Sequence, residues 1–145
     1  MKAAYIYNFA LFTEWPADLV PASAPFVMCV LGDAAVGEAL EQVVKGRVLA
    51  GHKMAVSRVA RPETQGACHI LYMSGVTVGQ MTQLVAGLHD LPVLTISDLE
   101  GFTEAGGMAQ FFFENGRLRF SVQLRSAEKA RLRISSRLLT LATRK

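Results

Sequence analysis

Short apolar runs bounded by turn residues alternate along the middle of the chain with segments of helical periodicity. The runs predict strands at residues 26–31, 54–59, 69–73 and 93–96. Between them, apolar positions spaced three and four residues apart predict helices over residues 36–44 and 78–88, the first with Asp33 as its N-cap. Because strands that alternate with helices are usually joined by right-handed crossovers, this order indicates a parallel sheet covered by helices.

Residues 106–124, GGMAQFFFENGRLRFSVQL, predict a β-hairpin that turns at Asn115-Gly116, since both residues tolerate the positive φ of a two-residue turn. The turn sets the cross-strand pairs, which are Glu114 with Arg117, Phe113 with Leu118, Phe112 with Arg119, Phe111 with Phe120, Gln110 with Ser121 and Ala109 with Val122. One face is then apolar and is predicted to pack on the core. The other face is polar and is predicted to meet water, with Arg117 and Arg119 as a candidate edge for a partner.

Both ends of the chain predict helices. The first sixteen residues predict an apolar helix that Pro16 ends, and it is either a core helix or meets another subunit or partner with part of its surface. Asn8 and the lack of a cleavage site argue against a signal peptide. Near the other end, Ser126 is a candidate N-cap for a helix through Ala130, and Ser135-Ser136 for a second, with one continuous helix as the alternative. The fold class is therefore α/β: a single domain over residues 1–145 with a mixed, mostly parallel sheet flanked by helices, a C-terminal antiparallel β-hairpin and terminal helices.

Composition supports a folded chain and leaves its partner open. With 145 residues, 51% of them hydrophobic, the chain can bury a core, and no run approaches the length of a membrane span. From residue 117 onward there are nine basic side chains and one acidic one. This asymmetry indicates either an acidic partner or membrane surface, or simply solvated outer faces of terminal helices. No nucleic-acid-binding motif accompanies it, so we expect no nucleic-acid partner.

Four polar residues follow the predicted strands, where α/β sheets bind ligands. They are Asp33, Ser74, Ser97 and Asp98, and together they form a possible small ligand pocket, although turns and caps ordinarily use the same residue types. The histidines, His52, His69 and His89, are scattered without metal-binding spacing, and no nucleophile signature is present. We therefore expect no metal site, no cofactor and no catalytic residues.

Cys29 lies inside one predicted strand and Cys68 just before another. If the strands are neighbours, the two residues can form a disulfide in an oxidising compartment. In a reducing compartment they would be buried thiols. The residues alone leave both readings open.

Several segments, taken in order, resemble the YfiR family of bacterial periplasmic proteins. They are KAAYIYNFALFTEWP, FVMCVLGD with GEAL, CHILYMS, PVLTISDLEGFTEAGGM and FSVQLRSAEKARLRISSRLLTLA, and they cover nearly the whole chain. The resemblance implies a periplasmic, non-enzymatic and usually dimeric repressor that binds the periplasmic domain of a membrane diguanylate cyclase. It also implies that Met1 replaces a removed signal peptide, and that an outer-membrane lipoprotein can sequester the repressor.

The resemblance carries over at two positions and fails at others. Cys29 and Cys68 match a family disulfide, so it implies a bridge between them. Members with a second cysteine pair around residues 101–111 are not matched, because that segment contains no cysteine. The leading prediction is thus a periplasmic regulator that acts in cyclic-di-GMP signalling through protein contacts. A periplasmic small-molecule sensor that uses the strand-end pocket is the alternative.

Overall fold

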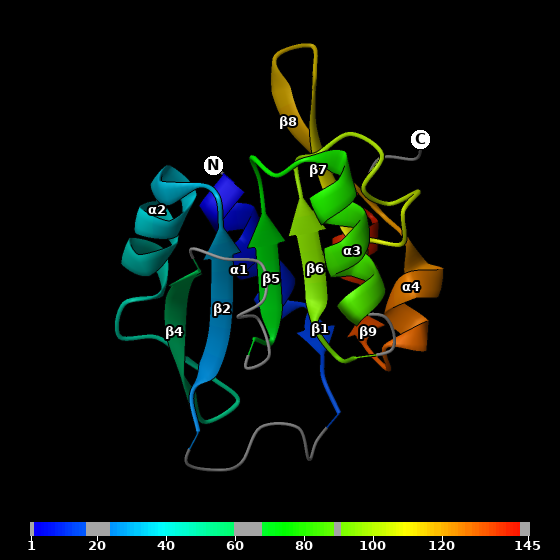
Figure 1. Cartoon of the computed structure of the whole chain (residues 1–145). Coiled ribbons are helices and arrows are strands. Elements are labelled where there is room, and N and C mark those ends of the chain that lie inside the picture. Colours follow the sequence, from blue (N-terminus) through cyan, green and yellow to red (C-terminus); the bar gives the residue numbers. More distant parts are fainter. Residues whose placement is uncertain (1, 17–23, 60–67, 89–90, 143–145) are drawn as a thin grey trace.

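The computed structural model describes residues 2–16, 24–59, 68–88 and 91–142, and its centre is a seven-stranded sheet (Figure 1). In chain order the strands are β2 (Phe26–Leu31), β3 (Val48–Leu49), β4 (His52–Val59), β5 (Ile70–Met73), β6 (Leu94–Ser97), β7 (Ala109–Glu114) and β8 (Arg117–Val122). Their spatial order is β3-β4-β2-β5-β6-β7-β8. Neighbours from β4 to β7 run parallel, whereas β3 and β8 pair antiparallel at the two edges. The predicted mixed, mostly parallel α/β sheet is confirmed.

Helices cover both faces of this sheet, which explains why its central strands are continuous apolar runs. Helices α1 (Lys2–Leu11) and α2 (Ala34–Val44) share one core with the side of the sheet that carries Met28, Ile70 and Tyr72. Helix α3 (Val78–Leu88) packs in a second core with Leu71 and Met73 on the other side. In Figure 1, α3 lies in front of the sheet and α1 behind it.

The two ends of the chain meet in a second, two-stranded sheet that the apolar pattern does not predict. Strand β1 (Thr13–Glu14) pairs antiparallel with β9 (Arg133–Ile134). The prediction that the first helix continues to Pro16 is therefore wrong: α1 ends at Leu11, because the residues after it pair with β9. Strand β9 separates α4 (Leu124–Lys129) from α5 (Ser136–Leu139), so the helical C-terminal segment is divided and not continuous. Strands β1 and β9 each have only two residues, and the two strands lie far apart in the sequence. Such short strands produce no hydrophobic periodicity, which is why β1 and β9 are not predicted.

Of the two caps predicted near the C-terminus, one is confirmed and the other is wrong. The Ser135 hydroxyl accepts a hydrogen bond from the Arg137 N–H and caps α5. Helix α4 instead begins two residues before Ser126, after Gln123, whose side chain makes no capping bond. The reason is that the Gln123 N–H is still bonded to the Met108 carbonyl at the end of the sheet, so the helix starts directly from the strand.

The hairpin has all six predicted cross-strand pairs, and Asn115 and Gly116 have the expected positive φ of 52° and 76°. The predicted roles of its two faces hold only in part. Phe113 is 68% exposed, because β6 pairs with β7 only at Ala109 and Gln110 and the outer half projects beyond the sheet (Figure 1). At the base, Gln110 is buried on the face predicted to meet water, and its side-chain oxygen accepts a hydrogen bond from the Thr103 N–H.

Candidate functional site

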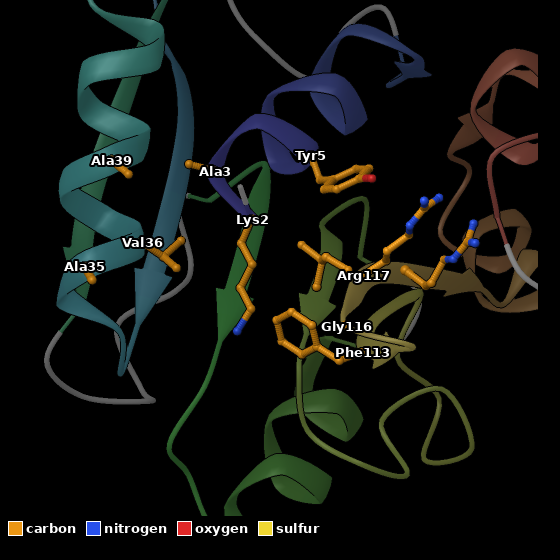
Figure 2. Close-up of a pocket in the computed structure, with 11 residues that line it drawn as sticks. Lys2, Ala3, Tyr5, Ala35, Val36, Ala39, Phe113, Gly116 and Arg117 are labelled. Carbon is orange, nitrogen blue, oxygen red and sulfur yellow. The ribbon is translucent and has the colours of Figure 1, made fainter.

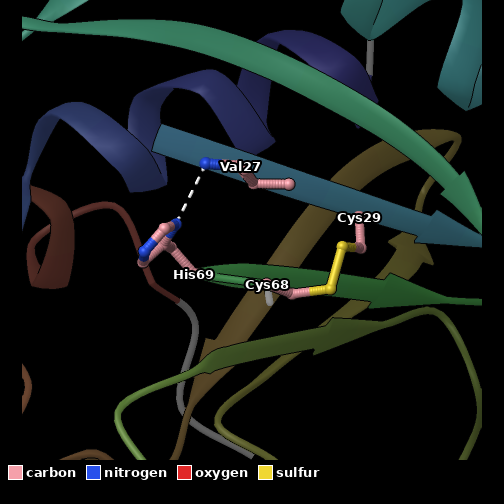
Figure 3. Close-up of a disulfide and its surroundings, with 4 residues drawn as sticks. All are labelled: Val27, Cys29, Cys68 and His69. Carbon is pink, nitrogen blue, oxygen red and sulfur yellow. Dashed lines mark hydrogen bonds between the residues drawn. A yellow bond between two sulfur atoms is a disulfide. The ribbon is translucent and has the colours of Figure 1, made fainter. Parts of the chain in front are cut away.

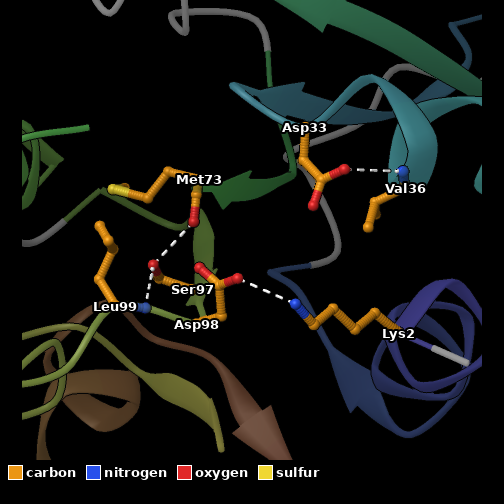
Figure 4. Close-up of polar contacts among 7 residues, drawn as sticks. All are labelled: Lys2, Asp33, Val36, Met73, Ser97, Asp98 and Leu99. Atoms are coloured by element: carbon orange, nitrogen blue, oxygen red, sulfur yellow. Dashed lines mark hydrogen bonds and ion pairs between the residues drawn. The ribbon is translucent and has the colours of Figure 1, made fainter. Parts of the chain in front are cut away.

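Strands β2, β5 and β6 run parallel, and their carboxyl ends lie at the same end of the sheet. The four predicted pocket residues are found there: Ser97 is the last residue of β6, and Asp33, Ser74 and Asp98 follow the strands. Asp33 caps α2, since its Oδ1 atom accepts a hydrogen bond from the Val36 N–H over 3.1 Å (Figure 4). Ser97 is fully buried; its hydroxyl donates to the Met73 carbonyl over 2.7 Å and accepts from the Leu99 N–H over 3.0 Å. Both side chains therefore support the turns in which they lie.

The turns after β2 and β5 are packed against each other. Gly32 has a φ of +81°, and a Cβ atom at this position would lie 1.9 Å from the carbonyl oxygen of Ser74. Only a residue without a side chain fits such an approach. Ser74 and Asp33 are thus brought to the same place by a direct backbone contact between the two turns.

Asp98 forms an ion pair with Lys2, at a distance of 2.9 Å between Oδ2 and Nζ (Figure 4). Burial raises the pKa of the Asp98 carboxyl. The hydrogen bonds from Lys2 and Ser74 and the positive charge of Lys2 lower it by more, so the pKa lies below its usual value. The hydroxyl of Tyr72 is buried nearby without a hydrogen-bond partner among the described residues. Burial, then the negative charges of Asp98 and Asp33, raise the pKa of Tyr72.

The four sequence-predicted residues therefore share one edge, with Asp33, Ser97 and Asp98 already hydrogen-bonded within the chain. A small-ligand pocket formed by Asp33, Ser74, Ser97 and Asp98 stays a prediction. A larger groove lies next to these four residues.

A groove of about 680 Å³ opens between α1, α2 and the outer half of the hairpin, at the same edge of the sheet (Figure 2). It is lined by small and apolar residues of the two helices together with residues from the hairpin tip, namely Lys2, Ala3, Tyr5, Ala35, Val36, Ala39, Phe113, Gly116, Arg117, Leu118 and Arg119. Of the residues predicted from sequence for function, only the hairpin edge with Arg117 and Arg119 belongs to this groove. The two helices that complete it carry no local signal of a site, since alanines and a valine also fit an ordinary helix surface.

The charge of the groove is positive. All three ionisable side chains that line it with a full charge at neutral pH are cations, Lys2, Arg117 and Arg119. Lys2 is paired with Asp98, whereas neither arginine has a carboxylate or hydrogen-bond partner within the part of the chain that the structure describes. The Nε atom of Arg119 is buried and has no hydrogen-bond partner among the residues that the structure describes. A buried donor without an acceptor costs free energy, so this atom favours an additional acceptor.

A disulfide joins Cys29 of β2 to Cys68, just before β5, with the Cα atoms 5.7 Å apart (Figure 3). Both residues are buried in the core beneath α3. The bridge implied by the family resemblance is therefore present in the structure. It links two strands that are already neighbours in the sheet.

Next to the disulfide, His69 is held in the neutral form. Its Nδ1 atom accepts a hydrogen bond from the Val27 N–H over 3.0 Å, and its ring stacks on Phe26 at a centroid distance of 5.1 Å (Figure 3). Burial lowers the pKa of His69, and the nearby His52 lowers it further. His89 lies outside the described residues, and within those residues no group of three or more His, Cys, Asp or Glu side chains can hold a metal ion.

Comparison with known proteins identifies the family. A model of the YfiR/HmsC-like family matches residues 1–143 of the chain. Comparison with curated proteins returns no match. Proteins of this family are periplasmic regulators and are not known as enzymes. Among the described residues no helix has the length and apolar character needed to cross a membrane. The chain belongs to the YfiR/HmsC-like family.

Proposed function

We propose that this protein represses an inner-membrane diguanylate cyclase by binding the periplasmic domain of that enzyme. The observation that carries the proposal is the family match over residues 1–143, because the family is one of periplasmic regulators in cyclic-di-GMP signalling. Regulation by contact needs an exposed surface that a partner can recognise and no reacting groups of its own.

Two features of the structure support this proposal. The outer half of the hairpin carries an exposed aromatic side chain, Phe113, and two arginines, Arg117 and Arg119, that have no ion-pair partner among the described residues. Aromatic and arginine residues are the ones that most often dominate protein interfaces. The disulfide between Cys29 and Cys68 fits an oxidising compartment such as the periplasm.

The proposal extends to two further partners. We expect the repressor to be a homodimer, and we expect an outer-membrane lipoprotein to compete for it and so release the cyclase. Both expectations come from the family resemblance. Size-exclusion chromatography with light scattering tests the first, and competition between the lipoprotein and the cyclase domain for the purified repressor tests the second.

A small-molecule sensor is the second candidate, and one observation favours it. The Tyr72 hydroxyl is buried beside Asp98 without a hydrogen-bond partner among the described residues, so a ligand donor or acceptor at the strand ends would satisfy it. Thermal-shift screening against periplasmic metabolites tests this candidate. A ligand that stabilises the protein but not its Tyr72→Phe variant supports the sensor, and the absence of any stabilising metabolite counts against it.

Deletion of the gene tests the regulatory proposal. Loss of the repressor is expected to raise cellular cyclic-di-GMP and biofilm formation, and expression of the wild-type protein in the periplasm is expected to lower both. The same protein expressed without a signal peptide is the matched control, since it cannot reach a periplasmic partner. Unchanged cyclic-di-GMP in the deletion strain contradicts the proposal.

A further inference from the structure

We infer that His69 is an acid-sensitive contact, which holds the start of β2 and the Trp15 side chain against β5 at neutral pH and releases them when its imidazole ring is protonated. Trp15, Phe26, Val27 and His69 are called the His69 junction below. The inference goes beyond the proposed function and does not depend on it, because it concerns the response of the protein to pH and not its partner. Members of the family are periplasmic, so the relevant pH is that of the periplasm.

His69 forms two hydrogen bonds with a single residue of β2. Its backbone N–H donates to the Val27 carbonyl over 2.9 Å, and its ring Nδ1 atom accepts from the Val27 N–H over 3.0 Å (Figure 3). The paired residues of β2 and β5 begin one position later, at Met28 and Ile70. The imidazole ring therefore supplies the acceptor that a strand carbonyl would otherwise provide, and it extends the pairing of β2 with β5 by one residue.

The same residue contacts two further segments of the chain. The His69 carbonyl accepts hydrogen bonds from the Leu94 N–H over 2.9 Å and from the Trp15 Nε1–H over 3.2 Å. The His69 ring stacks on Phe26 at a centroid distance of 5.1 Å, and Phe26 in turn contacts the Trp15 ring edge-to-face at 4.8 Å. A displacement of the His69 ring is therefore expected to change the environment of Trp15.

Protonation removes the acceptor that the His69 ring provides. Neutral imidazole has one nitrogen that donates and one that accepts, whereas both nitrogens of the protonated ring carry a hydrogen atom. No rotation of the protonated ring offers an acceptor to the Val27 N–H, and in the present geometry two donors would face each other. A partly buried donor that loses its acceptor costs free energy, so the contact between the ring and β2 is expected to open.

The groups around His69 keep its ring neutral until the pH is acidic. Burial lowers the pKa of His69, and the His52 ring on β4 lowers it further because imidazole becomes positively charged on protonation. The other groups that contact His69 lie on β2, on β6 and at Trp15, and none of these groups, all within the described part of the chain, carries a charge. The ring is therefore expected to accept from Val27 at neutral pH and to lose this bond below its usual pKa of 6.5.

A pH titration of the purified protein tests the inference, with Trp15 as the probe. Trp15 is the only tryptophan in the sequence, so tryptophan fluorescence reports on the His69 junction. As NMR shows the His69 ring becoming protonated, the Trp15 emission is expected to move to longer wavelength in one step. The protection of the Val27 amide against hydrogen exchange is expected to fall at least about tenfold in the same step. The far-ultraviolet circular dichroism is expected to stay constant, because the change is local.

Two variants separate the His69 ring from other groups that titrate in acid. In His69→Asn the side-chain amide oxygen can accept from the Val27 N–H at every pH, so the Trp15 emission and the Val27 protection are expected to show no step. His52→Asn is the matched control, because it removes the neighbouring histidine and keeps the His69 ring. In this control the step is expected to remain and to move slightly to higher pH, since His52 no longer lowers the pKa of His69.

Three results overturn the inference. The first is protonation of the His69 ring in the wild-type protein without loss of protection at the Val27 amide. The second is a step in the Trp15 emission that persists unchanged in His69→Asn. The third is a step that coincides with loss of the far-ultraviolet circular dichroism, because the protein then unfolds as a whole. The first and third results need no variant, so the inference can be refuted even if His69→Asn does not fold.

Discussion

The Lys2 ammonium lies 2.9 Å from the Asp98 carboxylate, and this ion pair joins the first turn of α1 to the end of β6 across 96 residues of sequence. Both side chains are about three quarters buried. The contact holds α1 against the edge of the sheet where the groove opens, so it connects the stability of the fold to the shape of the candidate site.

Breaking this pair is expected to destabilise the protein. Lys2→Met or Asp98→Asn should lower the free energy of unfolding by about 1 kcal/mol, the usual range for a partly exposed ion pair. Because the pKa of Asp98 is lower in the folded chain than its usual 3.8, the contribution is present above that value and disappears as the pH falls through the folded pKa. Urea unfolding of both variants and of the double variant measures the coupling, and additive effects would show that the pair does not contribute.

The disulfide between Cys29 and Cys68 is expected to contribute more to the free energy of unfolding than the ion pair between Lys2 and Asp98. Closure of a loop between residues 39 positions apart stabilises by about 4 kcal/mol in the chain-entropy model, so Cys29→Ala/Cys68→Ala should lose roughly that amount. A thiol reagent should find no free thiol in unfolded, unreduced protein. Two reactive thiols in that experiment would mean that the bridge does not form.

Stability is also expected to depend on the protonation of His69. Its pKa in the folded chain is below the usual 6.5, so the unfolded chain binds more protons between the two values. The free energy of unfolding should therefore fall as the pH drops below 6.5 and reach its lower level once the folded protein is also protonated. His69→Asn should flatten this part of the profile, whereas His52→Asn removes only a neighbouring charge and should keep most of it.

A substitution at Gly32 tests the close backbone contact between the turns after β2 and β5. Gly32→Ala places a Cβ atom 1.9 Å from the Ser74 oxygen and is expected to cost about 3 kcal/mol or more. Gly46 is the matched control, because its φ of +73° is similar and nothing lies within 4 Å of its Cβ position. Gly46→Ala should cost only about 1 kcal/mol, from backbone strain alone. Similar unfolding midpoints for the two variants would argue against the contact.

The order of strands and helices and the pairing of the hairpin could be predicted from sequence because both have local causes. Periodicity identifies the strands and helices between residues 26 and 97 except the two-residue strand β3, and Asn115-Gly116 sets the six cross-strand pairs. Turn chemistry does not say where the neighbouring strand stops, and for this reason Phe113 was predicted to be in the core but is exposed.

The candidate groove was accessible from sequence only at one side. Arg117 and Arg119 stand out as part of a basic segment, whereas Ala35 and Ala39 acquire a role only when α2 is packed beside α1 and faces the hairpin. The same long-range packing forms the β1–β9 pair, in which Thr13 lies opposite Ile134. Contacts of this kind depend on the assembled sheet and have no signature within either segment.

The most direct test of the regulatory account measures cyclic-di-GMP synthesis by the membrane cyclase in right-side-out spheroplasts. Purified repressor is added to the outside, which is the periplasmic face of the inner membrane. The wild-type protein and Arg125→Glu/Lys129→Glu are predicted to lower cyclic-di-GMP synthesis to the same extent, and Arg117→Glu/Arg119→Glu is predicted to lower it much less. Synthesis that stays constant at saturating wild-type protein would contradict the account.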